Sequence, residues 1–191
     1  MNIPIYKVSI NDLDEGINRI SLVEYPAVES NFLAFADNKK QVMFSANEEQ
    51  QMITGVLMRC DFPIYRIDNA GEYYIEFDAQ VIKEMAEKLL VDAHQNWVNI
   101  EHQAGSDVNG VYMVELFIKN TEKGINPKGF ETITDGSLFA TFKVRNERIW
   151  NDIKNGTFKG FSIEGTFYLT ESNDIYDDIL QTLNKIIDRI K

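Results

Sequence analysis

Short apolar runs separated by turn residues are the feature that most limits what this chain can fold into. Between residues 52 and 169 most of these runs are about four to eight residues long, as in strands, and Gly, Asn and Asp interrupt them. Only two stretches in this region, after Asp78 and after Asn146, have the period near 3.6 that a helix requires. We therefore predict a β-rich α+β domain with helices at its edges.

The expected elements follow from these patterns. Strands are predicted at about 3–10, 18–24, 31–36, 52–58, 64–67, 72–77, 97–102, 110–119, 137–144 and 157–169, and helices after Asp78, over 146–155 and from about Asn173. The turn at 68–71 makes a hairpin of two of the strands. One domain is expected over 1–191, with N-terminal strands and a loop at 1–51, a core at 52–169 and an amphipathic helix at 170–191.

Charge and cysteine content exclude several function classes. The net charge of -11 repels phosphate backbones and anionic lipid heads, so a nucleic-acid or membrane-surface role is disfavoured. No apolar run approaches the roughly 18 residues of a membrane span. Cys60 is the only cysteine, which excludes an internal disulfide and a structural zinc cluster, and no His/Glu spacing suits another metal.

An imidazole base at neutral pH would have to be one of two histidines. His94 lies in a polar connection and is expected to be a solvated loop residue. His102 ends the alternating run that contains Val98 and Ile100, so we expect its ring on the same strand face as these apolar side chains. A structural role for such a partly buried histidine is the alternative to catalysis.

Ser162 is the candidate nucleophile. It lies in a predicted strand between Gly160 and Gly165, whose lack of side chains leaves room for a substrate. A serine hydroxyl needs a neighbouring base, so Ser162 within reach of His102 would form an acyl-transfer pair. A serine in a strand can equally be an ordinary structural residue.

A third group should orient the histidine, and Glu115 is the first choice. The segment 111–118 is apolar on both faces except for this carboxylate, which pairing with His102 would satisfy. A strand-edge glutamate that reaches water or a lysine is the alternative explanation. Glu164 and Asp135 are the other candidates, although a turn explains Asp135 more simply.

The order of these motifs resembles bacteriophage prohead maturation proteases, above all the XkdF-like branch. The resemblance covers most of residues 18–169. The parts that carry it are His102, DGSLF at 135–139, NGTFKGFSIEG at 155–165, DFPIYRID at 61–68, EYYIEFDAQVIKEMAEKLL at 72–90 and ISLVEYPAVE at 20–29, and the segment 102–108 also looks like the assemblin histidine region. Many relatives read Ser-Ile-Gly-Phe where this chain reads Ser-Ile-Glu-Gly.

The resemblance implies a fold similar to that of the herpesvirus assemblins, a mainly antiparallel β-barrel-like sheet surrounded by helices. Assemblins complete their triad with a second histidine after the serine. This chain has no histidine after His102, so a carboxylate must replace it.

The implied activity is that of a serine endopeptidase that needs no cofactor and acts inside the phage prohead. Its substrates would be the scaffold and the major capsid protein, and it could form a homo-oligomer. Ser162 would attack, His102 would transfer the proton and Glu115 would orient His102. The rival expectation is a catalytically inactive head or cargo protein that keeps the protease fold and works by binding.

Overall fold

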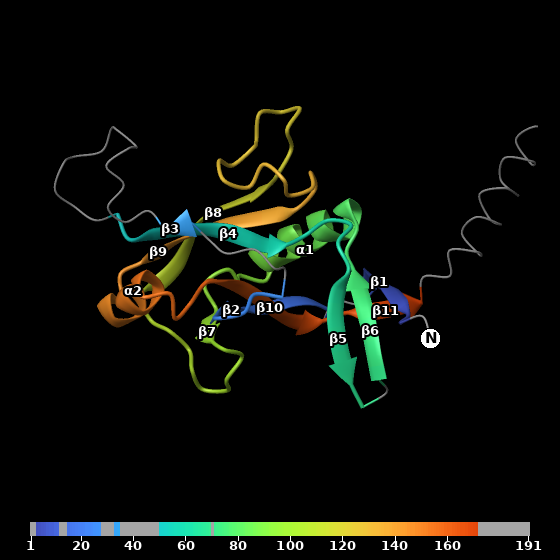
Figure 1. The fold of residues 1–191 in the computed structure, drawn as a ribbon, viewed down its shortest axis with the longest axis horizontal. Coiled ribbons are helices and arrows are strands. Elements are labelled where there is room, and N and C mark those ends of the chain that lie inside the picture. Colours follow the sequence, from blue (N-terminus) through green and yellow to red (C-terminus); the bar gives the residue numbers. More distant parts are fainter. Residues whose placement is uncertain (1–2, 12–14, 28–32, 35–49, 70, 172–191) are drawn as a thin grey trace, which may run out of the picture.

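The computed structural model describes residues 3–11, 15–27, 33–34, 50–69 and 71–171. Over this part of the chain, strands dominate and two helices flank them (Figure 1). The predicted helix from Asn173 lies outside the described residues, and so do residues 35–49 of the predicted N-terminal strands and loop. Neither helix that is described is long and apolar enough to span a membrane.

The strands form three sheets. The first has the order β11 (Tyr168–Glu171), β1 (Ile5–Ser9), β6 (Gly71–Glu76) and β5 (Ile64–Asp68). The second has the order β10 (Gly160–Thr166), β2 (Gly16–Val23) and β7 (Val98–Ile100). The third has the order β3 (Leu33–Ala34), β4 (Met52–Met58), β9 (Leu138–Val144) and β8 (Val111–Ile118).

The prediction of a mixed, strand-rich α+β fold is confirmed, and the barrel expectation is wrong for the part of the chain that is described. Most neighbouring strands are antiparallel, and only β1 with β6 and β2 with β7 are parallel. All three sheets are open, because in each of them the first and the last strand do not pair with each other.

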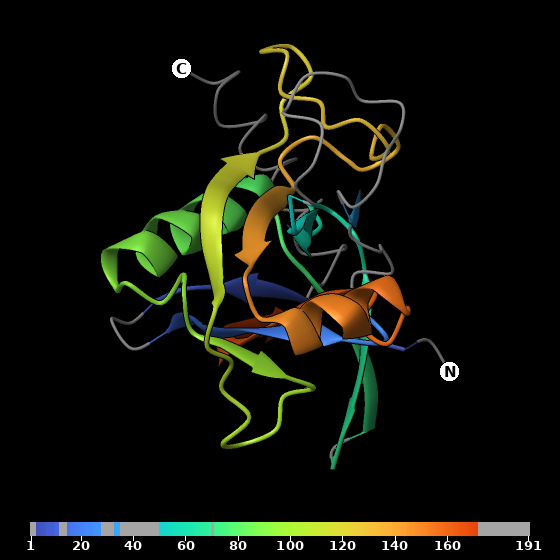
Figure 2. The same cartoon turned by 90° about the vertical axis from the view of Figure 1, so that its left-hand side faces the viewer.

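The core lies between the second and third sheets, with helix α1 (Ala79–Val91) against them (Figure 2). Phe161 of β10 and Phe142 of β9 meet there, with ring centroids 5.0 Å apart. Both rings are almost fully buried, and burial of one such side chain contributes about 1.5–3 kcal/mol to folding. The face of β10 opposite Phe161 is therefore left for polar residues.

Both predicted helices of the core region are present, and each begins at a polar cap. The Asp78 carboxylate accepts a hydrogen bond from the Val81 amide at 2.8 Å at the start of α1. The Asn146 side chain does the same for the amide of Ile149 at the start of α2 (Glu147–Lys154). Leu90, on the last turn of α1, is 51% exposed, whereas Val81, Ile82, Met85 and Leu89 are buried.

The predicted strand over 157–169 is two strands in the structure. The ladder of β10 with β2 has a register shift between Glu164 and Gly165 and ends at Thr166, and β11 then pairs with β1 in another sheet. Gly165 permits this bend, because a Cβ atom there would lie 2.1 Å from the carbonyl oxygen of Gly16. The bend ends the face of β10 that carries the candidate site.

Candidate functional site

Three buried polar side chains lie on one face of the second sheet. Ser162 of β10 is the register partner of Ser21 on β2, and Ser21 is the partner of Asn99 on β7. Register partners point to the same face of a sheet, here the face opposite the Phe161 ring. Their exposed fractions are 8% for Ser162, 0% for Ser21 and 2% for Asn99, so each needs a reason to be polar.

His102 joins this polar face, which corrects the prediction that it lies with Val98 and Ile100. Strand β7 ends at Ile100, and the next two residues, Glu101 and His102, have φ values of 50° and 56°. This left-handed backbone breaks the alternation of the strand and is uncommon for residues with side chains. The chain turns, and the connection that follows lies below β7 in Figure 1.

The imidazole of His102 contacts a carboxylate and a hydroxyl through the same nitrogen. Its Nδ1 lies 3.1 Å from Oε1 of Glu164 and 2.9 Å from Oγ of Ser21. The Glu164 oxygen also accepts a hydrogen bond from Nδ2 of Asn99 at 2.6 Å, and it lies 2.9 Å from the Ser21 hydroxyl. Ser21 is further bonded to Oδ1 of Asn99. The four residues form one connected network.

This network keeps Glu164 ionised. Burial by itself would raise the pKa of the Glu164 carboxyl, but hydrogen bonds from Asn99, Ser21 and His102 outweigh burial and bring the pKa below its ordinary value. A carboxylate held in the charged state beside Nδ1 can orient a histidine and stabilise its protonated form.

Ser162 shares the face of the network but is not bonded to it. Among the described residues its hydroxyl makes no hydrogen bond, and the serine that contacts His102 is Ser21. The other ring nitrogen of His102, Nε2, likewise makes no hydrogen bond in this part of the chain. The structure thus brings Ser162 and His102 to one side of the sheet without joining them.

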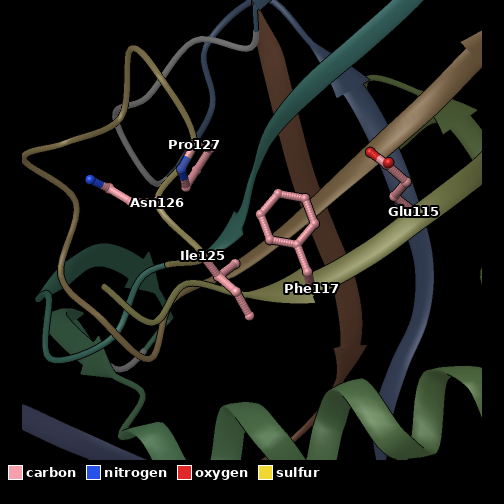
Figure 3. A pocket seen from close by; sticks show the side chains of 5 residues that line it. All are labelled: Glu115, Phe117, Ile125, Asn126 and Pro127. Carbon is pink, nitrogen blue, oxygen red and sulfur yellow. The ribbon is translucent and has the colours of Figure 1, made fainter. Parts of the chain in front are cut away.

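Glu115 lies elsewhere. It accepts a hydrogen bond at 2.7 Å from Thr141, its neighbour on β9, and the described residues contain no hydrogen bond or ion pair between it and His102. With Phe117 it faces the loop residues 125–127 across an open pocket (Figure 3). The predicted pairing of Glu115 with His102 is not found, because β8 belongs to a different sheet from β7 and β10.

Asp135 is a turn residue. Its carboxylate accepts hydrogen bonds from the amide of Thr121 at 2.8 Å and from the Thr121 hydroxyl at 2.7 Å, and it lies 3.4 Å from Nζ of Lys119. These contacts lower the pKa of Asp135, led by the bond from the Thr121 amide. The structure therefore agrees with the simpler explanation for this residue.

His94 also stays outside the network. Its Nδ1 lies 3.2 Å from the carbonyl oxygen of Ile17, and its ring packs on Trp97 at a centroid distance of 4.4 Å. The described residues contain no group of three or more His, Cys, Asp and Glu side chains that could hold a metal ion.

Ser21 and Asn99 are the members of the network that sequence reasoning missed. Each is a single polar residue inside an apolar strand, Ser21 between Ile20 and Leu22 and Asn99 between Val98 and Ile100. A polar residue in such a place is expected to have a buried partner, and this signal could have found both.

The sequence of the chain is similar to those of known phage-related proteins. The model of a family described as "Putative phage serine protease XkdF" matches residues 39–171. Two relatives are known in Bacillus subtilis strain 168. "Uncharacterized protein YqbD" is 27% identical over 165 residues, which are 83% of this chain and 47% of that protein. "Phage-like element PBSX protein XkdF" is 27% identical over 142 residues, which are 73% of this chain and 44% of that protein.

The chain spans less than half the length of either relative. No solved structure matches the chain, so the likeness to the assemblin fold stays a prediction.

Proposed function

Because the chain belongs to the XkdF family of phage proteins, we propose that it is a serine endopeptidase that acts during phage head assembly. The contact between His102 and Glu164 carries this proposal. An ionised carboxylate lies 3.1 Å from Nδ1 of a histidine, on the face of a sheet that also holds Ser162. Carboxylate, histidine and serine are the groups that acyl transfer by a serine enzyme requires.

Ser162 is the proposed nucleophile and His102 the proposed base. As Oγ of Ser162 attacks the peptide carbonyl carbon, Nε2 of His102 takes the hydroxyl proton, and it then gives this proton to the leaving amine. Water later attacks the acyl-enzyme and releases the acid. The ring of His102 is turned to Ser21 and Glu164, so Ser162 and Nε2 must approach each other when substrate binds, as catalytic hydrogen bonds often do.

Ser21 does not suit the role of nucleophile. It has no exposed surface, so a peptide carbonyl cannot reach its oxygen. It also contacts the Nδ1 side of His102, where the Glu164 carboxylate lies, and its hydroxyl is used within the network. Ser162 keeps some exposed surface and has no competing hydrogen bond in the described part of the chain.

Glu164 takes the orienting role that was first expected of Glu115. It was one of the alternatives, and it follows Ser162 by two positions on the same strand face. The pKa of its carboxyl is lowered by the donors around it, which keeps the negative charge that the protonated histidine needs.

The proposed substrates are the scaffold and the major capsid protein, and the proposed place of action is the interior of the immature head. The family description and the phage-like element named in one relative support a phage context. The proposed reaction uses the side chains of Ser162, His102 and Glu164 with a water molecule, and it needs no cofactor. The rival function is that of a non-catalytic head or cargo protein that keeps the same fold and works by binding.

Labelling of the nucleophile separates the two functions. Purified protein is treated with a fluorophosphonate, and the labelled peptide is identified by mass spectrometry, for the unaltered chain, Ser162→Ala and His102→Ala. Ser9→Ala is the control, because it removes a serine of β1, which belongs to a different sheet from the network. We expect a label on Ser162 that both site variants abolish and the control retains.

Cleavage is measured on the same set by co-expression with the scaffold and capsid proteins of the same phage element. The unaltered chain and Ser9→Ala should cut them, and the two site variants should not. If all four proteins behave alike in labelling and in cleavage, the enzyme proposal fails and the binding function remains.

A further inference from the structure

Ser21 and Asn99 have a role that neither the family nor the triad accounts for. We propose that these two residues are positioning residues that hold His102 as the tautomer with its proton on Nδ1 and hold the Glu164 carboxylate against it. The importance of this tautomer for catalysis rests on the proposed function, whereas the tautomer of His102 can be observed without any reaction.

The direction of each hydrogen bond follows from Glu164. An ionised carboxylate only accepts, so the group of Asn99 that lies 2.6 Å from it must be the amide nitrogen. The carbonyl oxygen of Asn99 then faces the Ser21 hydroxyl. Ser21 has one proton, and both Asn99 Oδ1 and Glu164 Oε1 are acceptors for it. Its proton is therefore directed away from His102.

His102 consequently meets two acceptors at Nδ1. These are the lone pair of Ser21 Oγ at 2.9 Å and the Glu164 oxygen at 3.1 Å. An unprotonated Nδ1 would face both without a hydrogen between them, which is unfavourable, so Nδ1 carries the proton. In the neutral ring Nε2 is then unprotonated, which is the state that a general base needs.

Burial of Ser21 and Asn99 strengthens the preference for the Nδ1–H tautomer of His102. Ser21 has no exposed surface and Asn99 only 2%, so bulk water does not compete for their hydrogen bonds. Ser21 lies on β2, the middle strand of its sheet, between the strands that carry Ser162 and Asn99. Nδ1 of His102 is thus held by Ser21 on β2 and by Glu164 on β10, and Asn99 on β7 bonds to both of these residues.

The proposed network also needs a residue from outside the segment that the family model matches. The family model matches residues 39–171, so Ser21 lies before the matched segment although its hydroxyl contacts His102. The matched segment alone would lack both this hydroxyl and strand β2.

The test is the tautomer of His102 by long-range 1H–15N correlation NMR on protein labelled with 15N-histidine at pH about 8. Ser162→Ala serves as the parent, so that self-cleavage cannot occur. The chain has two histidines, and His94→Gln in the same parent assigns the signals. We expect the Nδ1–H form to dominate for His102 in the parent.

Variants of the network in this parent give the comparison. Ser21→Ala and Asn99→Leu should shift His102 to a mixture of both tautomers, and Ser21→Thr, which keeps a hydroxyl, should restore the parent spectrum. Backbone amide spectra identify any variant that fails to fold, and Asn99→Leu decides the comparison if Ser21→Ala does not fold. A dominant Nε2–H form in the parent, or an unchanged tautomer ratio in both folded variants, overturns the inference.

Kinetics on the chain with Ser162 intact separates this inference from the proposed function. Ser21→Ala should lower kcat about 10- to 100-fold with little change in KM, and Ser21→Thr should recover it. If the tautomer behaves as expected and no protein hydrolyses peptide, the network stands and the protease proposal fails. If hydrolysis occurs but the tautomer ratio of His102 does not change in the Ser21 and Asn99 variants, the protease proposal stands and this inference fails.

Discussion

The carboxylate of Glu164 lies 3.1 Å from Nδ1 of His102. Glu164 is on β10 and His102 is in the turn after β7, and these two strands do not neighbour each other in their sheet. The contact crosses β2, whose Ser21 bonds to both residues. It places an ionised group beside the histidine on the side of the sheet that Ser162 shares.

Glu164→Gln should lower kcat by about 10²- to 10⁴-fold, because a neutral amide neither stabilises the protonated histidine nor fixes its tautomer. Glu115→Gln is the matched control, since Glu115 bonds to Thr141 and not to His102. The measurement is kcat and KM on a peptide taken from a cleaved capsid-protein junction. A larger loss in Glu115→Gln than in Glu164→Gln would return the orienting role to Glu115.

The stability that Glu164 contributes should depend on pH. Its pKa in the folded chain lies below the ordinary value of 4.5, so the folded state favours the ionised form. This contribution is fully present above pH 4.5 and is lost as the pH falls through the lowered pKa. Urea unfolding of the unaltered chain and Glu164→Gln should therefore differ most at neutral pH and converge in acid. A difference that grows in acid would contradict the ionised network.

Cys60 should not react with thiol reagents while the chain is folded. Burial, and then the bond and charge of Asp61, raise the pKa of its thiol to about 12, so almost no thiolate exists at pH 8. We expect slow reaction with DTNB in buffer and rapid reaction in 6 M guanidinium chloride, roughly the concentration that unfolds most domains. Fast reaction in buffer, at a rate independent of denaturant, would show that Cys60 is accessible.

Gly165→Ala should destabilise the fold at the bend between β10 and β11. The new Cβ would lie 2.1 Å from the Gly16 carbonyl oxygen, and relief of this overlap should cost at least about 1–3 kcal/mol. Gly124→Ala is the control, because no atom lies within 4 Å of its Cβ and only its left-handed φ of 76° opposes the change. That backbone cost is about 1 kcal/mol. Thermal unfolding measures both, and equal losses would contradict a close approach at Gly165.

Local features of the fold could be predicted from the sequence. The caps at Asp78 and Asn146, the hairpin at 64–76 and the buried face of α2 depend on side chains within a few residues of one another. Such interactions are the same in almost any tertiary context, so residue type and spacing were enough to predict these local elements. The break at Gly165 was missed because its cause, the carbonyl of Gly16, is remote in the chain.

The pattern of residues was enough to predict a strand-rich chain with helices after Asp78 and over 146–155, and to choose His102 and Ser162 as candidate base and nucleophile. The folded chain was needed to show that Glu164 and Ser21 contact His102, that Asn99 bonds to both of them, and that Glu115 lies in another sheet. Side-chain contacts between distant strands depend on sheet order, on register and on the left-handed turn at 101–102. These are properties of packing, and no short stretch of residues contains them.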